Sequence, residues 1–338
     1  MAHELTERED GKVEFFSAVT RGWHQLGQLT DRQLTAEEAI KEALLDWTVE
    51  QTPVYHKTAE GTDLQIPDQF LVRRTDNNHP LSIMSAAYTP IQNIEAFTFF
   101  DDIIGAGKAC WDTAGSLQGG RKVFMQAELE GSLFLNSNPE DTIKKKILFF
   151  TSHDGSKALT GMITPIRVVC QNTLNAALRN HSNCFKIYHR KNYSDKKVEA
   201  AKVLGFADAY FDDLQFVMDT LADKEVTTSY VEGFINALIP AELDPKTGYA
   251  HTRTSNRRNE IYVLFQSGQG NNGKTRWDLW NSVTEYVDHH QGGRLTGARK
   301  NRSDVGDDLL KAEARFERSI LGAGATLKQN AMNLLMAN

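Results

Sequence analysis

Three pairs of apolar segments, each pair joined by a short polar turn, constrain the fold of this chain more than any other feature. Runs that follow one another across a few turn residues pair as antiparallel hairpins. We therefore expect an antiparallel sheet, because parallel strands need long crossover connections between them. The paired segments are residues 70–75 with 81–85, 109–117 with 122–129, and 146–152 with 158–169.

Helical patterns flank this β-rich part on both sides. Residues 1–52 are acidic and read as a helical N-terminal region, with a helix that starts at Thr35. Residues 53–190 form a β-rich core with packed helices at 94–104 and 170–179, and residues 191–338 form a mainly helical region with basic connectors. The expected fold class is α+β: antiparallel hairpins packed on helices in the N-terminal half, and a mostly helical C-terminal half. The helices expected in the C-terminal region cover residues 195–221, 227–238, 276–289, 304–321 and a last segment up to 336.

The composition is that of a globular protein outside membranes. Hydrophobic residues make up 40% of the 338 residues and charged residues 24%, and no run of 18 apolar residues occurs. The N-terminus lacks the pattern of a secretory signal, and three unclustered cysteines argue against a disulfide framework. We expect the protein in the cytoplasm of a host cell, without a membrane segment.

A glycine-rich stretch offers one enzymatic interpretation. Gly268, Gly273, Lys274 and Thr275 occupy the fixed positions of a phosphate-binding loop, and the apolar run 261–265 before them reads as a strand. A nucleotide-hydrolysing domain also needs parallel strands and a carboxylate for Mg²⁺, and the 63 residues after Thr275 read as helices. The alternative is a glycine turn in which Thr275 caps the next helix.

Other reactive residues give weaker patterns. Cys170 stands near a predicted helix N-terminus, where His153 and Asn172 could serve as base and orienter, but Val168-Val169-Cys170 is better explained by a buried small side chain. His181, Cys184 and His189 are irregularly spaced, and a fourth zinc ligand is missing. We therefore predict no catalytic residue, no metal site and no cofactor.

Basic residues recur at turns and connectors, which favours a nucleic-acid-binding function. The net charge of −6 conceals an asymmetry, because residues 1–50 hold 5 basic and 11 acidic residues whereas residues 251–302 hold 9 basic and 4 acidic ones. Contacts between such cations and phosphates give sequence-independent affinity, and Trp111, Phe124 or Tyr193 could stack on bases. The predicted contacts are Arg121, Lys122, Lys157, Arg167 and Arg179, with His153 and Asn172 as polar neighbours.

Several segments resemble the phage and plasmid family known as domain of unknown function 932. This resemblance covers most of the chain and implies a mobile-element, bacteriophage origin, without any established activity. The segments are Trp23-His24-Gln25-Leu26-Gly27, Leu45-Asp46-Trp47, Tyr88-Thr89-Pro90-Ile91-Gln92-Asn93, Ser152-His153-Asp154-Gly155-Ser156, residues 164–174 and residues 281–289.

By topology alone, the hairpins that run into a helix at residues 146–179 are similar to single-strand annealing proteins of the RecT/Redβ and Rad fifty-two type. That likeness implies an oligomer that holds single-stranded DNA in a basic groove without ATP. The leading hypothesis is therefore a phage-encoded single-stranded nucleic-acid-binding protein, a homo-oligomer that anneals or recombines DNA; RNA is the alternative ligand. Two other hypotheses are a nucleotide-binding enzyme that uses Gly268–Thr275, and an interaction protein whose acidic N-terminal region acts on a host factor.

Overall fold

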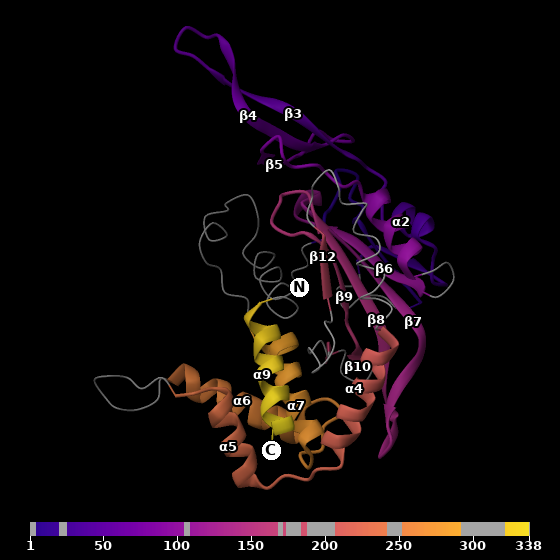
Figure 1. Cartoon of the computed structure of the whole chain (residues 1–338), viewed down its shortest axis with the longest axis vertical. Helices are drawn as coiled ribbons and strands as arrows, with labels where there is room; N and C mark the ends of the chain where they lie inside the picture. The colour runs from indigo at the N-terminus through magenta and orange to yellow at the C-terminus, as the bar shows by residue number, and fades with distance from the viewer. Residues whose placement is uncertain are drawn as a thin grey trace, which may run out of the picture.

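The computed structural model describes eight stretches of the chain (Figure 1). They are residues 5–19, 26–104, 109–167, 172–173, 184–187, 207–241, 252–291 and 322–337. Within them the protein has an α+β fold, in which two β-sheets come mainly from the N-terminal half and helices predominate in the C-terminal half. The predicted fold class is confirmed.

A large, curved sheet forms the centre of the molecule. Its strand order is β11-β10-β8-β7-β6-β1-β2, and β9 joins it between β8 and β12. All pairs are antiparallel except β1 with β2. The strands are β1 Phe15–Ala18, β2 Gln28–Thr30, β6 Ala109–Leu117, β7 Lys122–Leu135, β8 Asn138–Ser152, β9 Leu159–Ile163, β10 Ile166–Arg167, β11 Asn172–Thr173 and β12 Cys184–Ile187.

A second sheet has three antiparallel strands in chain order, β3 Val49–Lys57, β4 Asp63–Arg74 and β5 Pro80–Met84. The hairpin predicted at residues 70–85 is therefore confirmed as β4–β5. Beyond β5, β3 and β4 continue as a long two-stranded arm that projects from the rest of the molecule (Figure 1). The sequence reading missed this β3–β4 hairpin.

Two helices complete the N-terminal half. Helix α1, Ala36–Glu42, begins with the predicted cap, since the Thr35 hydroxyl accepts a hydrogen bond from the Glu38 amide and the Glu38 carboxylate reaches back to the Thr35 amide. Helix α2, Asn93–Ile104, confirms the helix predicted at 94–104. Buried residues of α1 and α2 share one apolar core with the β6–β8 part of the large sheet, including Trp111, Met125 and Phe149.

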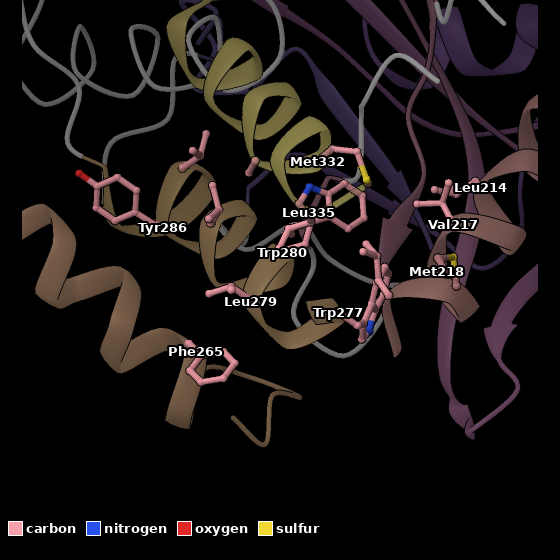
Figure 2. Packing of buried hydrophobic residues seen from close by; sticks show 14 of the residues in the cluster. Leu214, Val217, Met218, Phe265, Trp277, Leu279, Trp280, Tyr286, Met332 and Leu335 are labelled. Atoms are coloured by element: carbon pink, nitrogen blue, oxygen red, sulfur yellow. The ribbon is translucent and has the colours of Figure 1, made fainter. Parts of the chain in front are cut away.

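The C-terminal helices pack around α7. They are α4 Ala207–Ala222, α5 Thr228–Leu238, α6 Thr252–Ser267, α7 Arg276–Glu285 with a π-helical extension Tyr286–His290, and α9 Ala323–Ala337. Every residue of α7 is buried, so it is the central helix of this group rather than the amphipathic surface helix that its polar residues suggest. Figure 2 shows Trp277 and Trp280 of α7 among side chains of α4 and α9. Leu133, Leu135 and Ile143 belong to the same cluster and join these helices to the large sheet.

Three predictions about local structure were wrong. Residues 1–52 are less helical than expected, because β1 and β2 precede α1 and β3 crosses the proposed boundary at 52. The helix expected at 170–179 contains the strand β11 at Asn172–Thr173, and its other residues lie outside the described part. The strand expected at 261–265 is the second half of α6. The helix expected at 304–321 lies outside the described residues.

Candidate nucleic-acid interface

The β6–β7 turn and the loop after β8 lie side by side at one end of the large sheet. Lys122 at the start of β7 pairs with Ser152 at the end of β8. The His153 amide then donates to the Arg121 carbonyl at 2.8 Å. This register brings together four of the predicted contact residues, which the sequence places about thirty positions apart: Arg121, Lys122, His153 and Lys157.

The loop that carries Lys157 is held in shape by its own hydrogen bonds. The Ser152 hydroxyl donates to the Lys157 carbonyl and accepts from the Lys157 amide, both at 2.9 Å. Gly155 adopts a positive φ of 69°, as the tight reversal between β8 and β9 requires. Lys157 is half-buried, and within the described part of the chain neither Lys157 nor Arg121 forms an ion pair.

His153 has a different position from the one expected. Its side chain is 0% exposed, so in this structure it cannot touch a ligand at the surface. Its Nε2 lies 2.9 Å from Asn93 Oδ1, and its ring packs edge-on against Trp47 at a centroid distance of 5.5 Å. His153 therefore supports the loop from below.

The buried support around His153 joins three segments that are distant in sequence. The side-chain amide of Asn93 donates to the Leu45 carbonyl at 2.9 Å, and the Tyr88 hydroxyl donates to the Ser152 carbonyl at 3.2 Å. Burial raises the pKa of the Tyr88 phenol, and the nearby Asp154 adds to the shift, so the group stays a donor at neutral pH. Three of the segments on which the family resemblance rests, 45–47, 88–93 and 152–156, thus meet at this one place.

Arg74 connects the three-stranded sheet to the β6–β7 turn and to Trp47, beside the buried His153. Its guanidinium is 1% exposed and pairs with Glu14 at 2.6 Å and with Asp76 at 2.7 Å. It also donates to the Gly119 carbonyl at 3.3 Å and stacks over Trp47 at 4.1 Å. Burial alone would lower the pKa of Arg74, but the hydrogen bonds that its guanidinium donates to Asp76 and Glu14 outweigh this effect and raise the pKa. The charge of Arg74 is thereby neutralised inside the fold.

Two of the predicted contacts, Arg167 and Asn172, lie far from this end of the sheet. Arg167 on β10 pairs with Ile143 of β8 and with Asn172 of β11. Along β8, nine residues separate Ile143 from Ser152, which corresponds to about 30 Å of extended strand. The predicted residues therefore form two groups about 30 Å apart along β8, and Arg179 lies outside the described residues.

Two of the three lysines between these groups, Lys144 and Lys146, are already paired with carboxylates. The Lys146 ammonium contacts the Asp112 carboxylate and lies 3.5 Å from Glu128, which Lys144 also reaches at 3.0 Å. Burial raises the pKa of Asp112, and Lys146 offsets only part of that shift. Of the proposed stacking residues, Trp111 is buried, Phe124 is half-buried and Tyr193 lies outside the described part.

The glycine-rich stretch does not form a phosphate-binding loop. It connects two helices, α6 and α7, rather than a strand and a helix. The amides of Lys274 and Thr275 both donate to one Asp278 oxygen at 3.0 Å, and the Gln269 amide donates to Glu285 at 3.1 Å. Carboxylates of the chain itself thus occupy the loop amides that would hold phosphate. The prediction that Thr275 caps the next helix is confirmed, and Gly268 and Gly273 provide only the turn.

Other classes of site find little support in the described residues. No cluster of three or more His, Cys, Asp or Glu side chains suited to a metal ion occurs among them. Nor does any helix that the structure describes have the length and apolar character needed to span a bilayer. Two acidic residues of the N-terminal region are paired within the chain, Glu38 with Arg32 and Glu37 with Lys41, which leaves less of its charge for a partner.

Comparison with known proteins gives one finding. The model of a family described as "Domain of unknown function (DUF932)" matches residues 80–312. No curated protein matches the chain, and neither does any solved structure.

Proposed function

This chain belongs to the DUF932 family, and we propose that it is a phage-encoded protein that binds single-stranded DNA and anneals or protects it without ATP. RNA would satisfy the same contacts. The family itself carries no assigned function, so the proposal depends on the geometry of the large sheet.

One observation carries the proposal. The β7–β8 register brings Arg121 and Lys157 together with Lys122 at one end of the sheet, and within the described residues Arg121 and Lys157 have no carboxylate partner. A cation that the fold leaves unneutralised is available for phosphate, whereas Arg74 and Lys146 are consumed by internal ion pairs. Contacts of this kind position a nucleic-acid backbone and carry no sequence information.

Arg167, in the second group of predicted contacts, extends the proposed path of the nucleic acid along the large sheet. The backbone of Arg167 lies about 30 Å from this end along β8, and we propose that a flexible single strand that follows the sheet reaches this second predicted cation. Lys144 and Lys146, which lie between the two groups and are paired with carboxylates, contribute little net charge. We therefore expect affinity to rise with oligonucleotide length until both ends are spanned, and then to level off.

The occupied loop amides around Thr275 support the ATP-independent form of this proposal. The same hydrogen bonds disfavour a nucleotide-binding enzyme that would use Gly268–Thr275.

The direct test is a titration of a fluorescently labelled oligo-dT with purified protein at low and at moderate salt. Binding through phosphates predicts an affinity that falls steeply as salt rises, with little difference between base sequences. Absence of binding at low salt would remove the proposal.

Self-association of this protein through the β3–β4 arm is a second proposal, favoured by two exposed side chains. Tyr55 is 54% exposed and Leu64 48% exposed, and they lie on opposite faces of the arm, since Tyr55 pairs with Gln65 and Leu64 with His56. A projecting two-stranded arm presents strand edges at which a second chain can pair, and these exposed side chains lie beside them. Tyr55→Ser combined with Leu64→Ser should lower the particle mass measured by light scattering without lowering the melting temperature. An unchanged mass would exclude the arm as the contact.

A further inference from the structure

The joint between the three-stranded sheet and the β6–β7 turn contains four buried nitrogen atoms that have no hydrogen-bond acceptor among the described residues. They are Trp47 Nε1, Gln51 Nε2, Gln118 Nε2 and Arg121 Nε. All four carry hydrogens and act only as donors. Buried donors in native proteins nearly always find a partner, so four of them at one joint call for an explanation.

Contacts across the joint place Trp47 against the turn that carries Gln118 and Arg121. Arg74 stacks over Trp47 and also donates to the Gly119 carbonyl of the turn, next to Gln118. A Cβ atom at Gly120 would lie 3.0 Å from the Trp47 ring, so the indole lies directly against the turn that carries Arg121.

Gln51 approaches from the small sheet. It pairs with Val72, and Val72 pairs in turn with Ser82, so the three side chains share one face of that sheet. The Ser82 hydroxyl donates to the His153 carbonyl at 2.9 Å. The face that carries Gln51 is therefore the one turned toward the β6–β7 turn and the loop after β8.

We infer that this joint binds a phosphate group, and that it is the anchoring point of the nucleic acid in the function proposed above, on which the inference rests. A ligand that satisfies several donors at once must present several acceptor oxygens, and the Arg121 guanidinium calls for negative charge. A metal ion or an apolar group would leave the same donors unsatisfied. Phosphate meets both requirements.

Access to the joint follows from partial exposure. Gln51, Gln118 and Arg121 are half-buried, and Lys122 and Lys157 at the neighbouring positions are half-buried as well. The four nitrogen atoms are themselves buried in this structure, so binding requires the long side chains of Gln51, Gln118 and Arg121 to rotate toward the phosphate, with the Trp47 indole beneath them.

The test uses substitutions that remove a donor and keep the shape. Gln118→Leu and Gln51→Leu, combined in one protein, should weaken binding of labelled oligo-dT at least tenfold at low salt, with a melting temperature that is unchanged or raised. Trp47→Phe keeps an aromatic ring but removes the N–H, and should weaken binding severalfold. Lys274→Ala, on the exposed loop before α7, serves as the control and should bind as the wild type does.

A second measurement does not depend on DNA. Inorganic phosphate, compared with chloride at equal ionic strength, should raise the melting temperature of the wild type more than that of the Gln51→Leu/Gln118→Leu protein. If phosphate raises the melting temperature of both proteins equally, and both bind oligo-dT with equal affinity, the inference is overturned and the proposed function stands. If the wild type binds no DNA, but phosphate raises its melting temperature more than that of the Gln51→Leu/Gln118→Leu protein, the phosphate site is retained and the nucleic-acid function is not.

Discussion

Arg74 links three parts of the chain through a single guanidinium group. It bonds Glu14 from the N-terminal segment and Asp76 from its own sheet, and it stacks on Trp47 beside the β6–β7 turn. Sequence reasoning placed residue 74 in a hairpin but could not find its partners, since Glu14 lies 60 positions away. Such contacts depend on tertiary packing and leave no local pattern.

The Arg74–Asp76 pair predicts a response to acid. Burial alone would raise the pKa of Asp76, but the hydrogen bond and charge of Arg74 outweigh it and hold the pKa below the ordinary value of 3.8. A carboxyl group with a lowered pKa stabilises the fold above its unfolded pKa, and this contribution is lost as the pH falls through the folded value. In Asp76→Asn the melting temperature should therefore fall less steeply than in the wild type as the pH drops below 3.8. Identical acid-unfolding profiles for both proteins would contradict this assignment.

The Lys328–Asp288 pair predicts a large effect of a single substitution. The Lys328 side chain is 0% exposed and lies 2.6 Å from Asp288, on the π-helical extension of α7. Burial lowers the pKa of Lys328, and Asp288 offsets part of that shift. Lys328→Met leaves the Asp288 carboxylate without this cation and should cost about 3–5 kcal/mol in the free energy of unfolding. Adding Asp288→Leu should restore much of the loss, as measured by urea denaturation; a double variant no more stable than the single one would argue against the pair.

The elements with strong local signals were predicted correctly. The β4–β5, β6–β7 and β8–β9 hairpins have turn residues between apolar runs, and α1 has its capping residues. The β3–β4 arm was missed because both of its faces are exposed, so no alternation of apolar and polar residues marks it. Residues 261–265 were misread because a short apolar run fits a strand and a buried helix segment equally well.

The loop between α6 and α7 predicts a helix-capping role for Thr275. Its hydroxyl accepts from the Asp278 amide at 3.2 Å, and Thr275→Ala should lower the free energy of unfolding by about 1 kcal/mol. Lys274→Ala should change it by less than about 0.5 kcal/mol, because the side chain is exposed. Excess Mg-ATP should shift the melting temperature of neither variant nor of the wild type. A shift that Lys274→Ala abolishes would restore the phosphate-loop interpretation.

At the scale of the whole molecule, the large sheet places the candidate interface. The sequence identified the basic residues, but only the β7–β8 register shows that Arg121 and Lys157 come together and that Arg167 does not join them. Burial then distinguishes these residues by role, because the buried His153 side chain supports the loop whereas Arg121 and Lys157 are partly exposed. Neither outcome could be derived from spacing along the chain, since both depend on which strands pair and on what covers them.

The central claim is that Arg121 and Lys157 neutralise phosphates of a single-stranded nucleic acid. The most direct measurement is the salt dependence of oligo-dT affinity for the wild type and for Arg121→Ala/Lys157→Ala. The loss of two phosphate contacts should reduce the slope of log affinity against log salt by about 1.4. The control Lys57→Ala/Lys274→Ala, which removes two exposed lysines elsewhere, should keep the wild-type slope. A slope for Arg121→Ala/Lys157→Ala equal to that of the wild type would contradict the account.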